Sequence, residues 1–118
     1  KQEVFGPALH IIRYRADQLP AVIREINESG FGLTFGYHTR IDSAAAKAIQ
    51  EVQAGNIYIN RSIIGAVVGV QPFGGNGLSG TGPKAGGPYY LHRFATEKTV
   101  SINTTAAGGN ASLVMLSE

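Results

Sequence analysis

The fold is decided by one stretch in the first half of the chain, LTFGYHTRIDSAAAKAIQEVQAGNIYIN, residues 33–60. Its two ends, residues 33–37 and 56–60, are rich in β-branched and aromatic residues, which is typical of strands. Between them, Asp42 is a suitable N-cap for a helix that runs to Ala54, and Gly55 is a suitable stop signal. We expect this helix to bury one face, formed by Ala45, Ala48, Ile49 and Val52.

A second strand and helix are predicted before this stretch. Residues 8–14 (ALHIIRY) have the apolar content of a strand. Asp17 is a suitable N-cap for the helix that follows, with Pro20 in its first turn, and Gly30 can end that helix in a left-handed conformation. The apolar stripe expected on the helix consists of Leu19, Val22, Ile23 and Ile26.

The resulting order, β-α-β-α-β, predicts an α/β fold in which helices connect parallel strands. Three strands and two helices cover only part of an open parallel sheet, so the rest must come from chain outside this sequence. The first residue is Lys1 rather than methionine. We therefore expect a piece of a longer protein, with marginal stability by itself because apolar surface is left uncovered.

The second half of the chain has a different character, because most of its 16 glycines lie there. Residues 61–94 show no helical or strand periodicity, yet they contain apolar side chains that a disordered linker usually lacks. We expect an ordered loop that packs against other structure. Residues 96–102 then predict a strand without a local partner, which would pair with another domain or subunit, and a tail of small residues follows from Thr104 to Ser112.

Composition excludes several classes of function. The chain has 118 residues, 43% of them hydrophobic, a net charge of +2 and no cysteine. Without cysteine, disulfides, thiolate metal ligands and a thiol nucleophile are absent from this chain. The basic residues are scattered, which does not favour nucleic-acid binding. No apolar run reaches the roughly 20 residues of a membrane span, and we expect a cytoplasmic protein.

Two loop motifs are candidates for ligand binding. In EVFGP, residues 3–7, the Glu3 carboxylate could accept hydrogen bonds from a hydroxyl pair, and Phe5 could pack on a flat ring. The alternative is a turn that leads into the first strand. In GAVVGVQPFGG, residues 65–75, backbone N–H groups could bind a carboxylate and Phe73 could form a pocket wall. The alternative is a structural loop that needs glycine geometry.

The string GNGLSG, residues 75–80, has the spacing Gly-x-Gly-x-x-Gly but not the context of a dinucleotide fingerprint. That fingerprint requires a strand directly before it and a helix directly after it. Residues 71–73 (QPF) precede the string and residues 81–83 (TGP) follow it. We interpret it as a loop in which backbones approach closely.

Together these pieces resemble the aldehyde dehydrogenase superfamily. Its pattern E-x-F-G-P matches residues 3–7, N-x-Y-x-N matches residues 56–60, P-F-G-G-x-x-x-S-G-x-G matches residues 72–82, and a strand ending in K-x-V matches residues 97–100. Residues 79–91 are similar to the glutamate-semialdehyde (1-pyrroline-5-carboxylate) dehydrogenases. Residues 97–111 are similar to the bacterial PutA family, in which this dehydrogenase is joined to a proline dehydrogenase.

The resemblance implies a role for each matching position. Glu3 would hold the nicotinamide ribose of NAD, and Phe5 would pack beside the nicotinamide. Gly65 and Ala66 would anchor the α-carboxylate of glutamate semialdehyde through backbone N–H groups, and Phe73 would flank its aliphatic chain. No catalytic residue is assigned, because the family's nucleophilic cysteine and general-base glutamate lie upstream of Glu3.

The resemblance also implies a division of the chain and a set of partners. Residues 1–94 would belong to the catalytic domain and residues 95–118 to an oligomerisation flap that joins copies of the enzyme. The parent would use NAD here and FAD in a separate proline dehydrogenase domain, in the cytoplasm or peripheral at the membrane. This chain alone would be inactive. The alternatives are a related dehydrogenase with another acid substrate, or a stand-alone oligomerisation or binding module.

Overall fold

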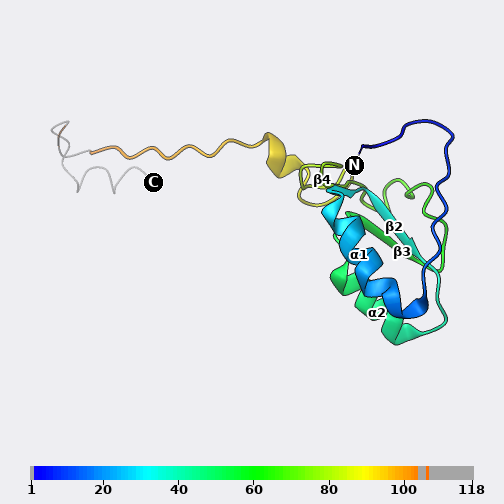
Figure 1. Cartoon of the computed structure of the whole chain (residues 1–118). Helices are drawn as coiled ribbons and strands as arrows, with labels where there is room; N and C mark the ends of the chain where they lie inside the picture. The colour runs from blue at the N-terminus through cyan, green and yellow to red at the C-terminus, as the bar shows by residue number, and fades with distance from the viewer. Residues whose placement is uncertain (1, 104–105, 107–118) are drawn as a thin grey trace.

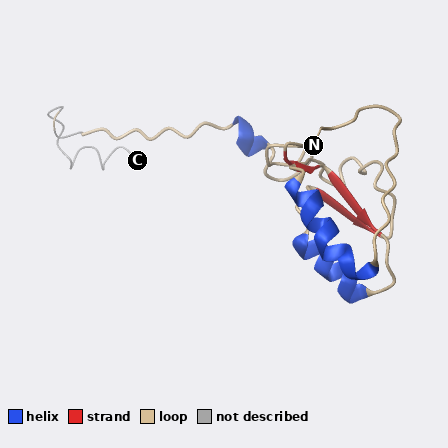
Figure 2. Cartoon of the chain, in the orientation of Figure 1, coloured by secondary structure: helices blue, strands red, loops and turns tan. Residues whose placement is uncertain are grey.

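The computed structural model describes residues 2–103 and residue 106. It contains two α-helices beside short strands. A long arm leads away from the body (Figures 1 and 2). In chain order the elements are η1 (Ala16–Gln18), α1 (Leu19–Glu28), β1 (Phe31–Gly32), β2 (Thr34–Tyr37), α2 (Asp42–Glu51), β3 (Asn56–Ile59), β4 (Asn76–Gly77) and η2 (Leu91–Phe94).

The predicted β-α-β unit is confirmed. Strands β2 and β3 are parallel, with Thr34 opposite Asn56 and Tyr37 opposite Ile59, and α2 is the connection between them. Helices α1 and α2 lie side by side on one face of this pair (Figure 1). A parallel pair needs a crossover of this kind, because a tight turn can join only antiparallel strands.

A small apolar core lies between the two helices and the strands. Its buried members are Ile23 of α1, Ala48 of α2 and Val52, which are 2%, 0% and 7% exposed. Partly buried side chains surround them, namely Leu19, Ile26, Phe35, Tyr37, Ala54 and Ile57. The prediction that Ile49 is buried is wrong, since it is 47% exposed. Its position turns it away from the stripe that Ala48 and Val52 share.

The predicted helix ends are correct in one place and wrong in three. Gly30 follows α1 with a φ of 79°, as expected for a left-handed helix stop. Asp17 is not the N-cap of α1, because it lies within η1 and its carboxylate pairs with Arg15 at 2.8 Å. Asp42 is the first residue of α2 rather than its cap, and α2 ends at Glu51 rather than Ala54 because Val52 has extended backbone.

The prediction of a strand at residues 8–14 is wrong. This segment has no strand hydrogen bonding, and its apolar side chains Leu9, Ile11 and Ile12 are about four-fifths exposed. A strand needs a neighbouring backbone to complete its hydrogen bonds. In the described part of the chain the sheets are two separate pairs, β1 with β4 and β2 with β3, so one parallel pair of the predicted β-α-β-α-β order is present.

Residues 61–94 form a long loop between β3 and the arm that contains the short strand β4 and the 3-10 helix η2. Its strand β4 pairs antiparallel with β1, which follows α1. Phe73 and Ala85 form a further bridge within the loop. The first pairing attaches the glycine-rich half of the chain to the segment that precedes β2, and the second holds two parts of the loop together.

Residues 96–102 lead away from η2 as a single extended arm (Figure 1). The strand predicted there is not formed within the described residues, since no backbone lies beside the arm to pair with it. The small-residue tail predicted from Thr104 to Ser112 lies outside the described residues, apart from Ala106. Among the described residues, none of the helices has the length and apolar character to cross a membrane.

Candidate functional site: a pocket in the glycine-rich loop

A cavity of about 350 Å³ lies within the glycine-rich loop. Its lining consists of Gly65, Ala66, Val68, Gly69, Gln71, Phe73, Ala85 and Gly86. The structure therefore brings together the three residues predicted to contact a substrate, Gly65, Ala66 and Phe73. The lining is mostly apolar, which suits the hydrocarbon part of a small ligand.

A tight turn shapes the first side of the pocket. The Val67 carbonyl accepts hydrogen bonds from the Val70 N–H at 3.1 Å and the Gln71 N–H at 2.8 Å. The Gln71 side chain closes the turn, because its Oε1 accepts the Val67 N–H at 2.9 Å. Gly65 and Gly69, which flank the turn, have φ values of 73° and 79°. Residues with a Cβ atom are strained at such positive φ values, which explains why glycine occupies both positions.

The Gly65 and Ala66 N–H groups are available to a ligand. Neither donates a hydrogen bond within the described residues, whereas the next N–H along, that of Val67, is used by Gln71. Successive backbone N–H groups near a left-handed residue form a concavity that binds anions. Both residues line the pocket, so their N–H groups are candidates to receive a carboxylate.

Arg61 supports this part of the loop from the end of β3. Its guanidinium lies over the Tyr58 ring, 4.6 Å from the centroid. The same group donates to the Ser62 carbonyl at 3.2 Å from Nε and to the Gly65 carbonyl at 3.4 Å from Nη2. The positive charge therefore lies beside the pair of N–H groups and favours an anion there.

Phe73 and its bridge partner Ala85 also line the pocket. The Phe73 N–H donates to the Ala85 carbonyl at 3.0 Å, and the Ala85 N–H donates to the Phe73 carbonyl at 2.9 Å. Phe73 is partly buried, and it lines the same pocket as Gly65 and Ala66. A flat apolar side chain in that place can pack against methylene groups.

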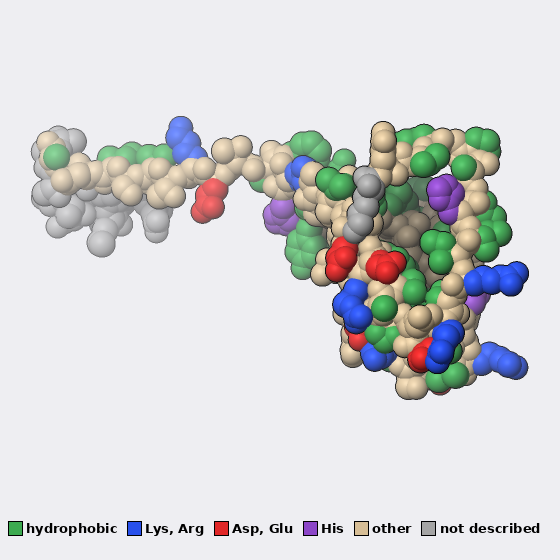
Figure 3. Space-filling model, in the orientation of Figure 1, with side chains coloured by type: hydrophobic (Ala, Val, Ile, Leu, Met, Phe, Trp, Pro, Cys, Tyr) green, Lys and Arg blue, Asp and Glu red, His purple; other side chains and the backbone are tan. Residues whose placement is uncertain are grey.

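Glu3 and Phe5 lie apart from this pocket. Both are exposed on the N-terminal segment, Phe5 by 88%, and neither contributes to the pocket lining. Hydrophobic side chains are exposed along this segment in the space-filling view (Figure 3). The structure of this chain therefore does not bring the residues predicted to bind the cofactor together with those predicted to bind the substrate.

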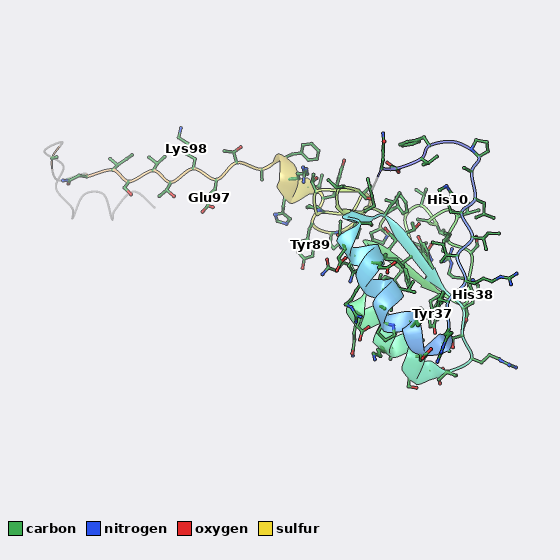
Figure 4. The ribbon with its side chains drawn as sticks, viewed as in Figure 1. His10, Tyr37, His38, Tyr89, Glu97 and Lys98 are labelled. Carbon is green, nitrogen blue, oxygen red and sulfur yellow. The ribbon has the colours of Figure 1, made fainter. Side chains whose placement is uncertain are left out.

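The histidines do not form a metal centre. Figure 4 shows His10 on the N-terminal segment and His38 at the end of β2, each on its own part of the chain. Among the described residues, no group of three or more His, Cys, Asp or Glu side chains could hold a metal ion.

Sequence reasoning missed three residues that build the pocket: Arg61, Gln71 and Asn56. Gln71 carried a weak signal, because a polar side chain after GAVVGV can reach back to close a turn. The roles of Arg61 and Asn56 depend on contacts with Gly65 and with Pro72 and Gly74. Asn56 lies 16 and 18 residues from its partners, so no local pattern indicates its role.

Comparison with known proteins gives a consistent family. Residues 1–100 match the model of the aldehyde dehydrogenase family. The chain is 62% identical over 100 residues to the bifunctional protein PutA of Rhizobium meliloti, covering 85% of this chain and 8% of that protein. It is 41% identical over 101 residues to the 1-pyrroline-5-carboxylate dehydrogenase of a Geobacillus species, covering 86% of this chain and 19% of that protein.

The solved structures that resemble this chain include PutA proteins as well. A crystal structure of proline utilization A (PutA) from Bradyrhizobium japonicum matches with a TM-score of 0.78 and 67% identity, covering 89% of this chain and 11% of that chain. PutA from Corynebacterium freiburgense matches with a TM-score of 0.57 and 37% identity, over 75% of this chain and 10% of that chain. The chain thus spans a small part of the relatives it matches. The chain belongs to the aldehyde dehydrogenase family.

Proposed function

We propose that this chain supplies the substrate-carboxylate end of the active site in an NAD-dependent dehydrogenase of L-glutamate γ-semialdehyde. The observation that carries the proposal is that Gly65, Ala66 and Phe73 line one and the same pocket. It offers two N–H donors for a carboxylate and an apolar wall for a short hydrocarbon chain. The PutA and 1-pyrroline-5-carboxylate dehydrogenase relatives support this substrate class.

Within the pocket, each residue has a separate task. The Gly65 and Ala66 N–H groups hold the α-carboxylate, and the Arg61 charge strengthens that interaction. Phe73 packs along the methylene groups between the carboxylate and the aldehyde. Binding energy collected at this remote carboxylate helps to orient the reacting carbon, and such orientation is worth up to about 7–11 kcal/mol in favourable cases.

The N-terminal segment has groups that fit NAD. Glu3 and Phe5 are both exposed, so a carboxylate and an aromatic ring are available to a ribose diol and a nicotinamide. NAD, when bound, would supply the hydride acceptor of the oxidation. The sequence contains no cysteine. A thiolate nucleophile would therefore come from elsewhere in the parent enzyme, and this chain alone would be inactive.

The parent would be a bifunctional enzyme of proline catabolism. Residues 1–94 would complete its aldehyde dehydrogenase catalytic domain, and residues 95–118 would form the oligomerisation flap and tail. An FAD-dependent proline dehydrogenase domain would accompany them on the same polypeptide, and the 62% identity to a protein named bifunctional PutA supports a parent with two activities.

The arm supports a second role in self-association. Residues 96–102 expose Val100 by 67% and Ile102 by 79%, and the backbone there is unpaired within the described part of the chain. An extended segment with free backbone groups can add to the sheet edge of a partner. We propose that the arm joins copies of the parent enzyme, which is tested by comparing the molar mass of the full-length protein with and without residues 95–118.

The carboxylate anchor is tested with Gly65→Leu in the full-length enzyme. A Cβ added at Gly65 meets no heavy atom within 4 Å apart from its chain neighbours, and Gly65 lines the pocket, so a leucine there has room to occupy the space of a ligand. We expect the KM for glutamate semialdehyde to rise by roughly tenfold or more, with the KM for NAD nearly unchanged, since loss of a charge-assisted pair of hydrogen bonds costs about 1.5–3 kcal/mol each.

The matched control is Gly82→Leu. Gly82 has a φ of 122° and also has open space around it, but it does not line the pocket. The control also places a leucine at a glycine with positive φ, and it should leave both KM values near those of the wild type. Equal rises in the KM for semialdehyde and for NAD in Gly65→Leu would contradict the anchor.

A further inference from the structure

One buried side-chain amide joins the start of β3 to the segment that carries Phe73. Asn56 is only 9% exposed. Its Nδ2 donates to the Pro72 carbonyl at 3.0 Å, and its Oδ1 accepts the Gly74 N–H at 3.0 Å. The amide therefore binds the backbone on both sides of Phe73, and it uses a donor and an acceptor as a neighbouring strand would.

Glycines allow this close contact. A side chain at Gly55, the residue before Asn56, would overlap the Gly74 carbonyl, and a side chain at Gly75 would overlap the Ser79 carbonyl. The contact at Gly55 places the backbone that follows Phe73 directly on the backbone that enters β3, whereas the contact at Gly75 lies within the loop. Phe73 is held on its other side by its two hydrogen bonds with Ala85.

These contacts leave the Phe73 backbone with little freedom. Its own N–H and carbonyl are bound to Ala85, and the carbonyl before it and the N–H after it are bound to Asn56. The direction of the Phe73 side chain follows from the direction of its backbone, because rotamers are limited by the local φ and ψ. Asn56 itself does not line the pocket.

We propose that Asn56 is a positioning residue that fixes Phe73 in the pocket and thereby sets how tightly the pocket holds the hydrocarbon chain of its substrate. This inference rests on the proposed function, and it adds a residue outside the pocket to the determinants of specificity. Asn56→Asp removes the donor to Pro72 and places a negative charge beside that carbonyl, with almost no change in size.

Asn27 provides a matched control. Its Nδ2 donates to the Glu51 carbonyl at 2.8 Å, and its Oδ1 accepts the Gln53 N–H at 2.8 Å. This amide makes the same kind of double contact, but it joins the ends of α1 and α2 and does not touch the pocket segment. Asn27→Asp therefore measures how far the loss of such a double hydrogen bond changes the KM values through reduced stability alone, without an effect on the pocket segment.

The experiment uses the full-length enzyme and two aldehydes, glutamate semialdehyde and pentanal, which has as many carbons and no carboxylate. Because Phe73 contacts the chain rather than the carboxylate, Asn56→Asp should raise the KM for both aldehydes about tenfold, and leave the KM for NAD within about twofold. Asn27→Asp should leave all three within about twofold. In a Phe73→Ala background, Asn56→Asp should add little, because the two residues act through one contact.

Two results would overturn the inference: equal KM values for the aldehydes in the Asn56 and Asn27 variants, or full additivity of Asn56→Asp with Phe73→Ala. If Asn56→Asp does not fold, Asn56→Ser, which cannot reach both backbone groups, is compared in the same way. A wild-type enzyme that oxidises pentanal but not glutamate semialdehyde would contradict the proposed function while leaving the test of Asn56 in place.

Discussion

In the β-α-β unit, the chain is held by parallel strand pairing and a few buried apolar side chains, of which Ile23 and Ala48 are the most enclosed. In residues 61–94, the pocket is held by hydrogen bonds from side-chain amides to backbone, and by glycines that let backbones touch. The first region takes its shape from periodicity in the sequence. The second takes its shape from single contacts between distant residues.

Because of this difference, we expect the first region to determine mainly the stability of the fold and the second to determine mainly the selectivity of the pocket. A change in the core of the first region should weaken the fold and leave the pocket intact in the molecules that stay folded. A change in the second region should alter the pocket with a smaller cost in stability. Three substitutions in the full-length enzyme test this division, in order of the size of the expected effect.

The largest effect is expected for Ile23→Ala. Ile23 is 2% exposed between the helices, and large-to-small changes at such sites cost about 2–5 kcal/mol. The measurement is the midpoint of thermal inactivation, which should fall clearly, while the KM for the aldehyde stays unchanged. Ile49→Ala is the control, because Ile49 is 47% exposed on α2 and should cost less than about 1 kcal/mol. Similar losses in both would mean that the core is not where the structure places it.

A smaller effect is expected for Gly55→Ala. The added methyl group would overlap the Gly74 carbonyl, and overpacking of this kind costs about 1–3 kcal/mol. Because the clash pushes on the Phe73 segment, both the thermal midpoint and the KM for the aldehyde should change. Gly74→Ala is the control at the same contact, since a side chain there would meet Lys84 only at 3.5 Å. An unchanged KM for the aldehyde in the Gly55→Ala variant would contradict a structural connection between the start of β3 and the pocket.

The smallest effect is expected for Gln71→Leu. It keeps the size of the side chain but removes the acceptor of the Val67 N–H, a contact worth about 0.5–1.5 kcal/mol. We expect a rise of about threefold in the KM for the semialdehyde and almost no change in thermal midpoint. Gln50→Leu on the exposed side of α2 is the control. A larger change in stability than in KM would contradict the assignment of Gln71 to the pocket.

The sequence predicts the first region better than the second, for a physical reason. The β2-α2-β3 unit and the glycine stop at Gly30 follow from local preferences, which act within a few residues. The strand predicted at residues 8–14 failed because local apolar content cannot supply the partner that a strand requires. The cap predicted at Asp17 failed because its carboxylate pairs with Arg15 instead.

The residues of the candidate site also fall into two groups: those that a local sequence pattern indicates and those whose role depends on contacts in the folded chain. The motif with Gly65, Ala66 and Phe73 was visible as a glycine-rich run with apolar residues, and these three residues do line one cavity. Its supports at Asn56 and Arg61 were not visible, because their partners are chosen by the folded backbone. The roles of Glu3 and Phe5 stay predictions, since the pocket does not include them.

The most direct test of the central claim is a crystal structure of the full-length enzyme with glutamate, the product of the proposed oxidation. The account predicts that the α-carboxylate lies within hydrogen-bonding distance, about 2.7–3.2 Å, of the Gly65 and Ala66 N–H groups, with Phe73 along the methylene chain. A glutamate bound with its α-carboxylate elsewhere, and with Gly65 and Ala66 facing only solvent or protein, would contradict it.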